Sequence, residues 1–208
     1  MKDLVLYLHG KGGSAEESEH FRPLFSNSEV IGLAYRSDVP WKAGTEISDA
    51  VNELQDRYGS ITLIANSIGA YFCMCAGIGG QIDRVYFISP IVDMERLIRD
   101  RMTRAGVSEA RLKAEGVIAT DSGDDLSWEY LCYVRSHPVK WDVPTEILYG
   151  SRDHLTAYET IKAFAKAHGA GLTVMEGGEH WFHTDGQMRF LDAWIREKEA
   201  IHMREETK

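Results

Sequence analysis

The strongest chemical signal in this sequence is a serine placed at an abrupt turn. The apolar run at residues 61–65 stops at Asn66-Ser67 and passes directly into a segment of helical character. A serine at such a strand-turn-helix elbow projects its hydroxyl from the edge of a sheet, and the elbow needs small residues two positions before and after the serine. Ala65 and Gly69 satisfy that requirement. Ser67 is therefore a candidate nucleophile, with capping of the following helix as its alternative role.

An acid and a base follow later apolar runs. Asp153 comes after residues 145–149, and His180 comes after residues 172–175 and a Gly-Gly pair. A histidine can take the serine proton during attack on a carbonyl, while a carboxylate fixes the imidazole tautomer and stabilises its cation. Asp153 can instead cap the helix that is expected after it. The chain order of serine, acid and histidine favours the catalytic interpretation.

Two histidines, His180 and His183, compete for the role of base. Thr184 and Gln187 match a capping box, in which a Ser or Thr is followed three residues later by Glu or Gln. His183 would then be tied to the entrance of the terminal helix, whereas His180 lies in the free part of the loop. We expect His180 to be the base, with Trp181 and Phe182 packing the loop down.

A glycine-rich loop, His9-Gly10-Lys11-Gly12-Gly13-Ser14, follows the first apolar run. In a parallel sheet this loop lies at the carboxyl ends of the strands, where ligands bind. Its backbone would provide one N–H to a developing oxyanion, with Lys11 as the first choice and Gly12 next, and Ile68 would provide the other. A phosphate-binding loop is not matched, because no glycine stands at the required distance before Lys11.

From His9-Gly10 to the terminal helix, the sequence resembles the α/β-hydrolase superfamily, and it looks like one of the compact, esterase-like members that lack a leading antiparallel hairpin. The resemblance implies a covalent acyl-enzyme and neither cofactor nor metal. Carried over residue by residue, it implies a triad of Ser67, Asp153 and His180. Ala65 is the one departure, because the first small residue of the elbow is more commonly glycine.

Apolar runs that alternate with segments of helical period predict an α/β fold. We expect a three-layer sandwich around a mostly parallel six-stranded sheet, with strands at residues 4–8, 30–34, 61–65, 84–88, 145–149 and 172–175. Crossover helices are expected at residues 45–58 and 155–168. A terminal helix should follow Thr184, and its charge-rich end from Glu197 onward should fray or stay solvated.

Residues 91–143 exceed the length of a simple crossover and contain no convincing strand. Helical patterns at residues 94–102, 110–115 and 126–134, with a turn at 121–124, predict a small helical cap. The cap would be an insertion within a single domain, residues 1–208, and caps of this kind shape substrate pockets. Trp128 from the insertion, together with Trp181 and Gly12, is a candidate substrate-binding residue.

Composition disfavours several other classes of function. The net charge of -9 argues against nucleic acid and anionic membranes as partners, and no apolar run approaches the roughly 18 residues of a membrane-spanning helix. The sequence has an acidic residue, Asp3, near its start, and its first apolar run is too short for a signal peptide. Its three cysteines, an odd number, fit a reducing compartment. A cytoplasmic location is expected, and the oligomeric state stays open.

The expected function is hydrolysis of an ester or thioester of a small-molecule acyl substrate. Acyl transfer to another acceptor, and C–C bond hydrolysis, would use the same triad. A metal-dependent hydrolase is a further alternative, suggested by His180, His183 and Asp185. The last alternative is a ligand-binding member of the fold without catalysis.

Overall fold

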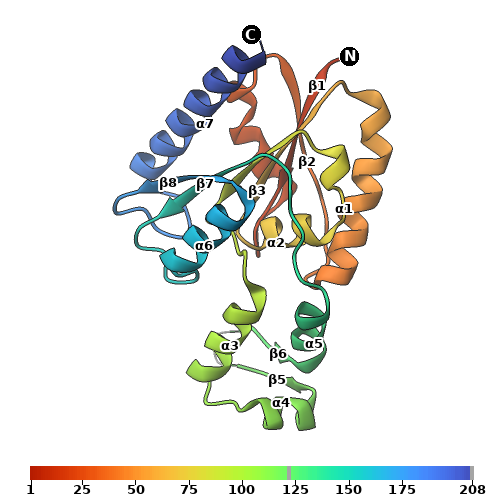
Figure 1. Cartoon of the computed structure of the whole chain (residues 1–208), viewed down its shortest axis with the longest axis vertical. Coiled ribbons are helices and arrows are strands. Elements are labelled where there is room, and N and C mark those ends of the chain that lie inside the picture. The colour runs from red at the N-terminus through yellow and green to blue at the C-terminus, as the bar shows by residue number, and fades with distance from the viewer. Residues whose placement is uncertain (121–122, 207–208) are drawn as a thin grey trace. The chain divides into compact units, whose positions relative to one another are not determined.

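The structure, a computed structural model, describes residues 1–120 and 123–206. The chain divides into two compact units, the first formed by Met1–Val92 and Trp141–Lys208 and the second by Asp93–Lys140. Figure 1 shows the sheet of the first unit and the short helices of the second. The turn predicted at residues 121–124 starts outside the described residues.

The first unit is built on a six-stranded sheet in which every neighbouring pair of strands is parallel. The strand order across the sheet is β2-β1-β3-β4-β7-β8. In chain order the strands are β1 (Asp3–Leu8), β2 (Ser28–Gly32), β3 (Ile61–Asn66), β4 (Arg84–Ile88), β7 (Thr145–Gly150) and β8 (Gly171–Met175). All six lie within two residues of the predicted strands, so the predicted parallel sheet is confirmed.

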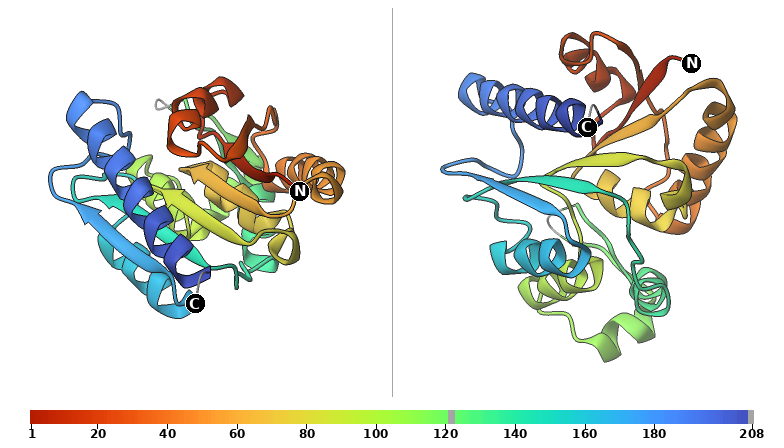
Figure 2. Two further views of the ribbon diagram at one scale, coloured as in Figure 1. Left: turned by 90° about the horizontal axis from the view of Figure 1, so that it is seen from above. Right: turned by 45° about the horizontal axis from the view of Figure 1, so that its top comes forward.

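Helices cover both faces of this sheet, which confirms the predicted three layers (Figure 2). One face carries α1 (Pro40–Leu54), α2 (Ile68–Cys75) and α6 (Tyr158–His168). The other carries α7 (Asp185–Glu206) and two 3-10 helices that the sequence did not suggest, η1 (Ala15–His20) and η2 (Arg22–Leu24). Two further 3-10 turns, η3 (Gln55–Arg57) and η4 (Gly79–Gln81), lie in the connections.

The strands are apolar on both faces because both faces are covered. In β1, Leu4, Leu6 and Leu8 alternate with Val5 and Tyr7, and all five side chains are at most 2% exposed. Each fully buried aliphatic side chain contributes roughly 1.5 to 3 kcal/mol to stability. The central strands therefore appear in the sequence as continuous apolar runs rather than as alternating ones.

Two helices start at residues other than those predicted. The helix α1 begins at Pro40 rather than at residue 45, because a proline at the first helical position has a suitable φ and no N–H to leave unpaired. The helix α6 begins at Tyr158 rather than at residue 155. Its start is delayed because Asp153 binds the N–H groups of Leu155 and Thr156 in the preceding loop.

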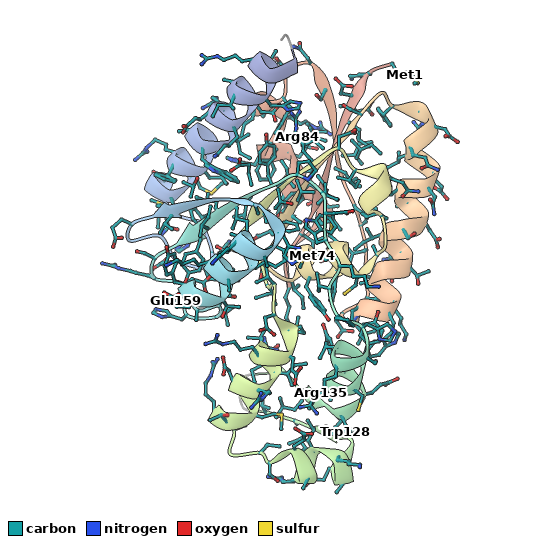
Figure 3. All side chains as sticks on the ribbon, viewed as in Figure 1. Met1, Met74, Arg84, Trp128, Arg135 and Glu159 are labelled. Atoms are coloured by element: carbon teal, nitrogen blue, oxygen red, sulfur yellow. The ribbon has the colours of Figure 1, made fainter. Side chains whose placement is uncertain are left out.

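The helix α7 continues to Glu206, so the fraying predicted from Glu197 does not occur within the described residues. Its later part is anchored to the sheet. The Tyr86 hydroxyl donates to Glu199 at 2.5 Å, and Arg84, labelled in Figure 3, forms an ion pair with the same carboxylate at 3.4 Å. No described helix, α7 included, is long and apolar enough to cross a membrane.

The second unit contains, within its described residues, three helices and a short hairpin. Its elements are α3 (Met94–Arg104), α4 (Glu109–Glu115), β5 (Val117–Ile118), β6 (Leu126–Ser127) and α5 (Trp128–Ser136). The hairpin corrects the expectation that this segment has no strand, since two-residue strands are too short to show a period. Arg135 links the helices by binding Glu95 and Glu109 at 2.8 and 2.7 Å (Figure 3). The action of this unit as a cap stays a prediction.

We expect Tyr86→Phe to lower the free energy of unfolding by about 1 to 2 kcal/mol, because it removes a hydrogen bond to a carboxylate while the ring keeps its place. Burial, reinforced by Glu199, raises the pKa of Tyr86, so its hydroxyl is still a donor at pH 7. Urea denaturation at pH 7 measures the change. An unchanged unfolding midpoint would show that this contact adds nothing to the anchoring of α7.

Candidate active site

Ser67 occupies a strained turn between β3 and α2. Its φ of 52° and ψ of −119° are unusual for a residue with a side chain, a conformation that costs on the order of 1 to 3 kcal/mol. The main chain at the end of β4 holds this turn, because the Ser67 N–H donates to Ile88 at 3.0 Å and the Ile91 N–H donates to the Ser67 carbonyl at 3.0 Å. The Ser67 side chain makes no capping hydrogen bond to α2, so the alternative capping role is not observed.

The helix α2 passes very close to the end of β1, and Gly69 makes this approach possible. A Cβ atom at Gly69 would lie 2.6 Å from the His9 carbonyl oxygen and 3.0 Å from that of Leu8. Two residues before the serine, Ala65 is fully buried in β3. The need for a small residue two positions after Ser67, inferred from the sequence, therefore has a direct steric cause.

Ser67, His180 and Asp153 form one chain of hydrogen bonds. The Ser67 Oγ lies 2.8 Å from His180 Nε2, and His180 Nδ1 lies 2.7 Å from Asp153 Oδ2. A carboxylate only accepts, so Nδ1 carries the ring proton and Nε2 is the acceptor that faces the serine hydroxyl. The Asp153 side chain is 0% exposed and that of His180 is 18% exposed. This arrangement can remove a proton from Ser67 when the hydroxyl attacks an electrophile.

Both oxygens of Asp153 are in use. While Oδ2 accepts from His180, Oδ1 accepts the N–H groups of Leu155 at 2.7 Å and Thr156 at 3.0 Å. Asp153 does not cap α6, because that helix begins only at Tyr158. These hydrogen bonds instead shape the loop to which Asp153 belongs. The Tyr149 hydroxyl supports the same loop by donating to the Thr156 carbonyl at 2.8 Å. Burial, and secondarily the Asp153 charge, raise the pKa of Tyr149.

The loops that carry Asp153 and His180 are joined backbone to backbone. The Arg152 N–H donates to Gly178 at 2.8 Å, and the Ser151 N–H donates to Met175 at 3.0 Å. A Cβ atom at Gly150 would lie 2.5 Å from the Gly178 carbonyl group, so a larger residue there would push the loops apart. The separation of acid and base is therefore set by the pairing of β7 with β8.

His183 lies at the entrance of α7, as predicted. Its N–H donates to Gln187 at 3.2 Å, and the Gln187 N–H donates to the Thr184 hydroxyl at 3.3 Å. The His183 ring faces the Trp181 carbonyl at 2.7 Å and Glu179 at 3.6 Å. Within residues 1–120 and 123–206, no group of three or more His, Cys, Asp or Glu is arranged to hold a metal ion.

The glycine-rich loop lies against Ser67. A Cβ atom at Gly10 would be 3.2 Å from the Ser67 Cβ. The Gly13 N–H donates to the Gly10 carbonyl at 3.1 Å, which closes a turn with Lys11 and Gly12 at its centre, and Gly12 has a φ of +75°. Ile68 is the first residue of α2, where N–H groups have no partner within the helix and the helix dipole favours negative charge. Their roles as oxyanion donors stay predictions.

The two predicted substrate-binding tryptophans occupy different units. Trp181 is 68% exposed and stacks on His183 at 4.6 Å, so it does not pack its loop down, whereas Phe182 is buried in the core. An indole stacked on a neighbouring imidazole lacks the core contacts that would hold the loop. Trp128 belongs to the second unit, where the Lys113 ammonium lies 5.7 Å from its ring centroid (Figure 3).

Sequence reasoning missed two tyrosines beside the glycine-rich loop. Tyr35 stacks on His9, and the Tyr7 hydroxyl donates to Glu17. One weak signal was present, because Tyr35 directly follows the predicted strand at residues 30–34 and so belongs at the same edge of the sheet as His9. Nothing in the sequence indicated that their rings face each other.

His180→Ala should lower kcat/KM for an activated ester by at least ~10³-fold, because it removes the group that accepts the serine proton. His183→Ala should change it little, since that ring contacts Trp181 and Glu179 rather than Ser67 or Asp153. Circular dichroism of both variants controls for folding. The reverse ranking would make His183 the base.

Asp153→Asn should keep the shape of the loop but lower kcat by about 10⁴-fold, because an amide that donates to His180 favours the wrong imidazole tautomer. Initial rates on the same activated ester measure the loss. Asp142→Asn is the matched control, because Asp142 lies on the surface before β7 and should leave kcat unchanged. Full activity of Asp153→Asn would mean that the acid comes from another residue.

This chain resembles known proteins in its fold. No family model matches the sequence, and no curated protein matches it. Among solved structures, Est1E from Butyrivibrio proteoclasticus matches with a TM-score of 0.77 and 19% identity over 98% of this chain and 89% of that chain. Est1E with bound ferulic acid matches with a TM-score of 0.75 and 19% identity, covering 97% of this chain and 90% of that chain.

The esterase Pf2001 from Pyrococcus furiosus matches with a TM-score of 0.63 and 18% identity over 98% of this chain and 82% of that chain. Identities this low establish a shared architecture and nothing finer. The six-stranded parallel sheet covered by helices on both faces agrees with these matches. The chain therefore has the α/β-hydrolase fold.

Proposed function

We propose that this chain is a serine hydrolase that cleaves an ester or thioester of a small-molecule acyl substrate. The observation that carries the proposal is the hydrogen-bonded chain from Ser67 Oγ through His180 to Asp153, with distances of 2.8 and 2.7 Å, at a strained elbow. Strained backbone costs free energy and clusters at functional sites, so a strained serine beside a histidine supports a catalytic role.

In the first half-reaction, Ser67 Oγ attacks the acyl carbonyl carbon while His180 Nε2 takes the hydroxyl proton. The backbone N–H groups of Ile68 and Lys11 hold the oxyanion that forms. His180 then returns its proton to the departing alcohol or thiol, which leaves an acyl-enzyme. Asp153 keeps the ring in the tautomer that these transfers need.

In the second half-reaction, water replaces the alcohol. His180 takes a proton from the water as its oxygen attacks the acyl-enzyme, and the same N–H groups hold the second oxyanion. Collapse of this intermediate releases the carboxylic acid, and His180 returns the proton to Ser67. Each step uses only side chains and backbone groups of this chain, the substrate and water, so the proposed reaction needs no cofactor.

Ester bonds are proposed because Pf2001, which shares the fold, is an esterase by name, and Est1E, which also shares it, is described with bound ferulic acid. Trp181 is the proposed substrate contact in the first unit, since it is 68% exposed and adjoins His180 in the chain. Gly12 and Trp128 are proposed as further contacts. Acyl transfer would use the same triad, and adding an alcohol acceptor and analysing the products separates it from hydrolysis.

The decisive experiment uses Ser67→Ala, p-nitrophenyl acetate and a fluorophosphonate probe that labels active serines. We expect the variant to lose probe labelling and to lose turnover by about 10⁴- to 10⁶-fold, with an unchanged circular dichroism spectrum. Wild-type activity should survive a chelator. Labelling of Ser67→Ala at the wild-type level would reject the nucleophile, and a chelator-sensitive rate restored by a divalent ion would favour the metal-dependent alternative.

A further inference from the structure

We propose that two buried tyrosines, Tyr35 and Tyr7, are positioning residues that hold the glycine-rich loop at residues 9–14 in the shape that binds an oxyanion. This inference rests on the proposed function, because it assigns the tyrosines a role in that same site. Neither tyrosine contacts the reacting atoms. Each acts through the main chain of the loop or through its flanking residues.

The loop has a composition that does not hold one conformation without support. Three of its six residues are glycine, and glycine loses more backbone freedom on ordering than any other residue. Gly12 has a φ of +75°, in the region that glycine enters readily. An oxyanion donor stabilises a transition state only when it already lies about 3 Å from the developing charge. Contacts outside the turn must therefore fix this loop.

Tyr35 clamps the start of the loop. Its hydroxyl donates to the His9 carbonyl at 2.5 Å, and its ring stacks on the His9 imidazole with centroids 4.3 Å apart and planes 6° apart. His9 Nε2 also lies 3.3 Å from the Tyr35 carbonyl oxygen. Tyr35 is itself only 6% exposed and meets Phe72 of α2 edge-on at 5.8 Å. Main chain and ring of His9 are thus both fixed, one residue before Gly10.

Tyr7 anchors the end of the loop. Its hydroxyl donates to Glu17 Oε2 at 2.5 Å, and Glu17 Oε1 accepts the N–H of Ser14, the last loop residue, at 3.4 Å. The Glu17 carboxylate also lies where a Cβ atom at Gly13 would be, at 2.6 Å, so it packs directly on the loop. The Tyr7 hydroxyl on β1 therefore fixes the Glu17 carboxylate, which in turn binds the last residue of the loop.

The same Tyr7 hydroxyl reaches toward the nucleophile elbow. Burial raises the pKa of Tyr7 and Glu17 raises it further, whereas a hydrogen bond with the side chain of Asn66, the residue before Ser67, lowers it. Burial raises the pKa of Tyr35 as well. Both hydroxyls therefore stay protonated, and able to donate, at the ordinary tyrosine value of about 10.

A purely structural role makes a different prediction from a positioning role. Tyr86 is the matched control, because it is also buried and, like Tyr7, donates one 2.5 Å hydrogen bond to a carboxylate, but that bond anchors α7. If the loop tyrosines only stabilise the fold, their phenylalanine variants should behave like Tyr86→Phe. If they position the loop, they should lose turnover in addition.

The experiment measures kcat, KM and the Kd of phenylboronic acid, which forms a tetrahedral adduct on an active serine, for Tyr35→Phe, Tyr7→Phe, the double variant and Tyr86→Phe. We expect kcat on p-nitrophenyl acetate to fall by ~10-fold or more in each loop variant, while KM stays within about threefold of the wild-type value. The reason is that a displaced oxyanion donor weakens binding of the transition state much more than binding of the substrate. Boronate affinity should fall with kcat. The double variant should lose less than the product of the single losses, since both residues act on one loop.

Tyr86→Phe should keep wild-type kcat and boronate affinity. The proposal is overturned if Tyr35→Phe and Tyr7→Phe also keep them, or if Tyr86→Phe loses as much as they do. Should Tyr7→Phe fail to fold, Glu17→Gln weakens the same contact from an exposed side chain and carries the same expectation. The proposed function fails separately, through a Ser67→Ala protein that still turns over the ester.

Discussion

The closeness of α2 to the end of β1 is the constraint on which the rest of the site depends. Because Gly69 lies against the carbonyl groups of Leu8 and His9, the turn between β3 and α2 has no room for a relaxed conformation, and Ser67 takes a positive φ. The strain is held by Ile88 and Ile91, which bond the main chain of Ser67 from the β4 side. Ser67 must follow a central strand of the sheet, because β1 and β4, the strands on either side of β3, both take part in shaping this turn.

The three side chains of the proposed triad come from three separate strand ends, and the sheet order decides how they meet. Ser67 follows β3, Asp153 follows β7 and His180 follows β8, with β4 between the first two. His180 must reach back across two strands to touch the serine. The backbone bonds of Arg152 and Ser151 to the β8 loop make this reach possible, because they tie the histidine loop to the shorter acid loop.

Much of this site could be predicted from the sequence, because the order of serine, acid and histidine along the chain is chemically informative. An elbow serine, an acid after a later strand and a histidine after the last strand can be read without coordinates, and Ser67, Asp153 and His180 do lie in hydrogen-bond contact. The contact between His9 and Tyr35 could not be read in this way. It joins residues 26 positions apart, and their meeting depends on the register between β1 and β2.

Other misses have equally local causes. The hairpin of β5 and β6 has strands of two residues, and no period is visible over so short a length. The later part of α7 has many charged residues, and composition predicted that it frays or stays solvated; most side chains from Ala200 to Arg204 are exposed, but the helix does not fray within the described residues. Its order there comes from Arg84 and Tyr86 on β4, which bind Glu199 from more than a hundred residues away in the chain. Contacts between residues so far apart in the chain leave no pattern in a short stretch of the sequence.

The second unit has a consequence for how this protein can diversify. The chain leaves the first unit at Val92 and returns at Trp141, yet β4 and β7, the strands on either side of this excursion, are direct neighbours in the sheet. Because β4 and β7 are parallel, the connection must cross from the carboxyl end of β4 to the amino end of β7, and the entropy of closing such a connection grows only slowly with its length. A change in the length of this segment should therefore cost little in loop entropy while the register of the sheet, and with it the position of Ser67, is kept.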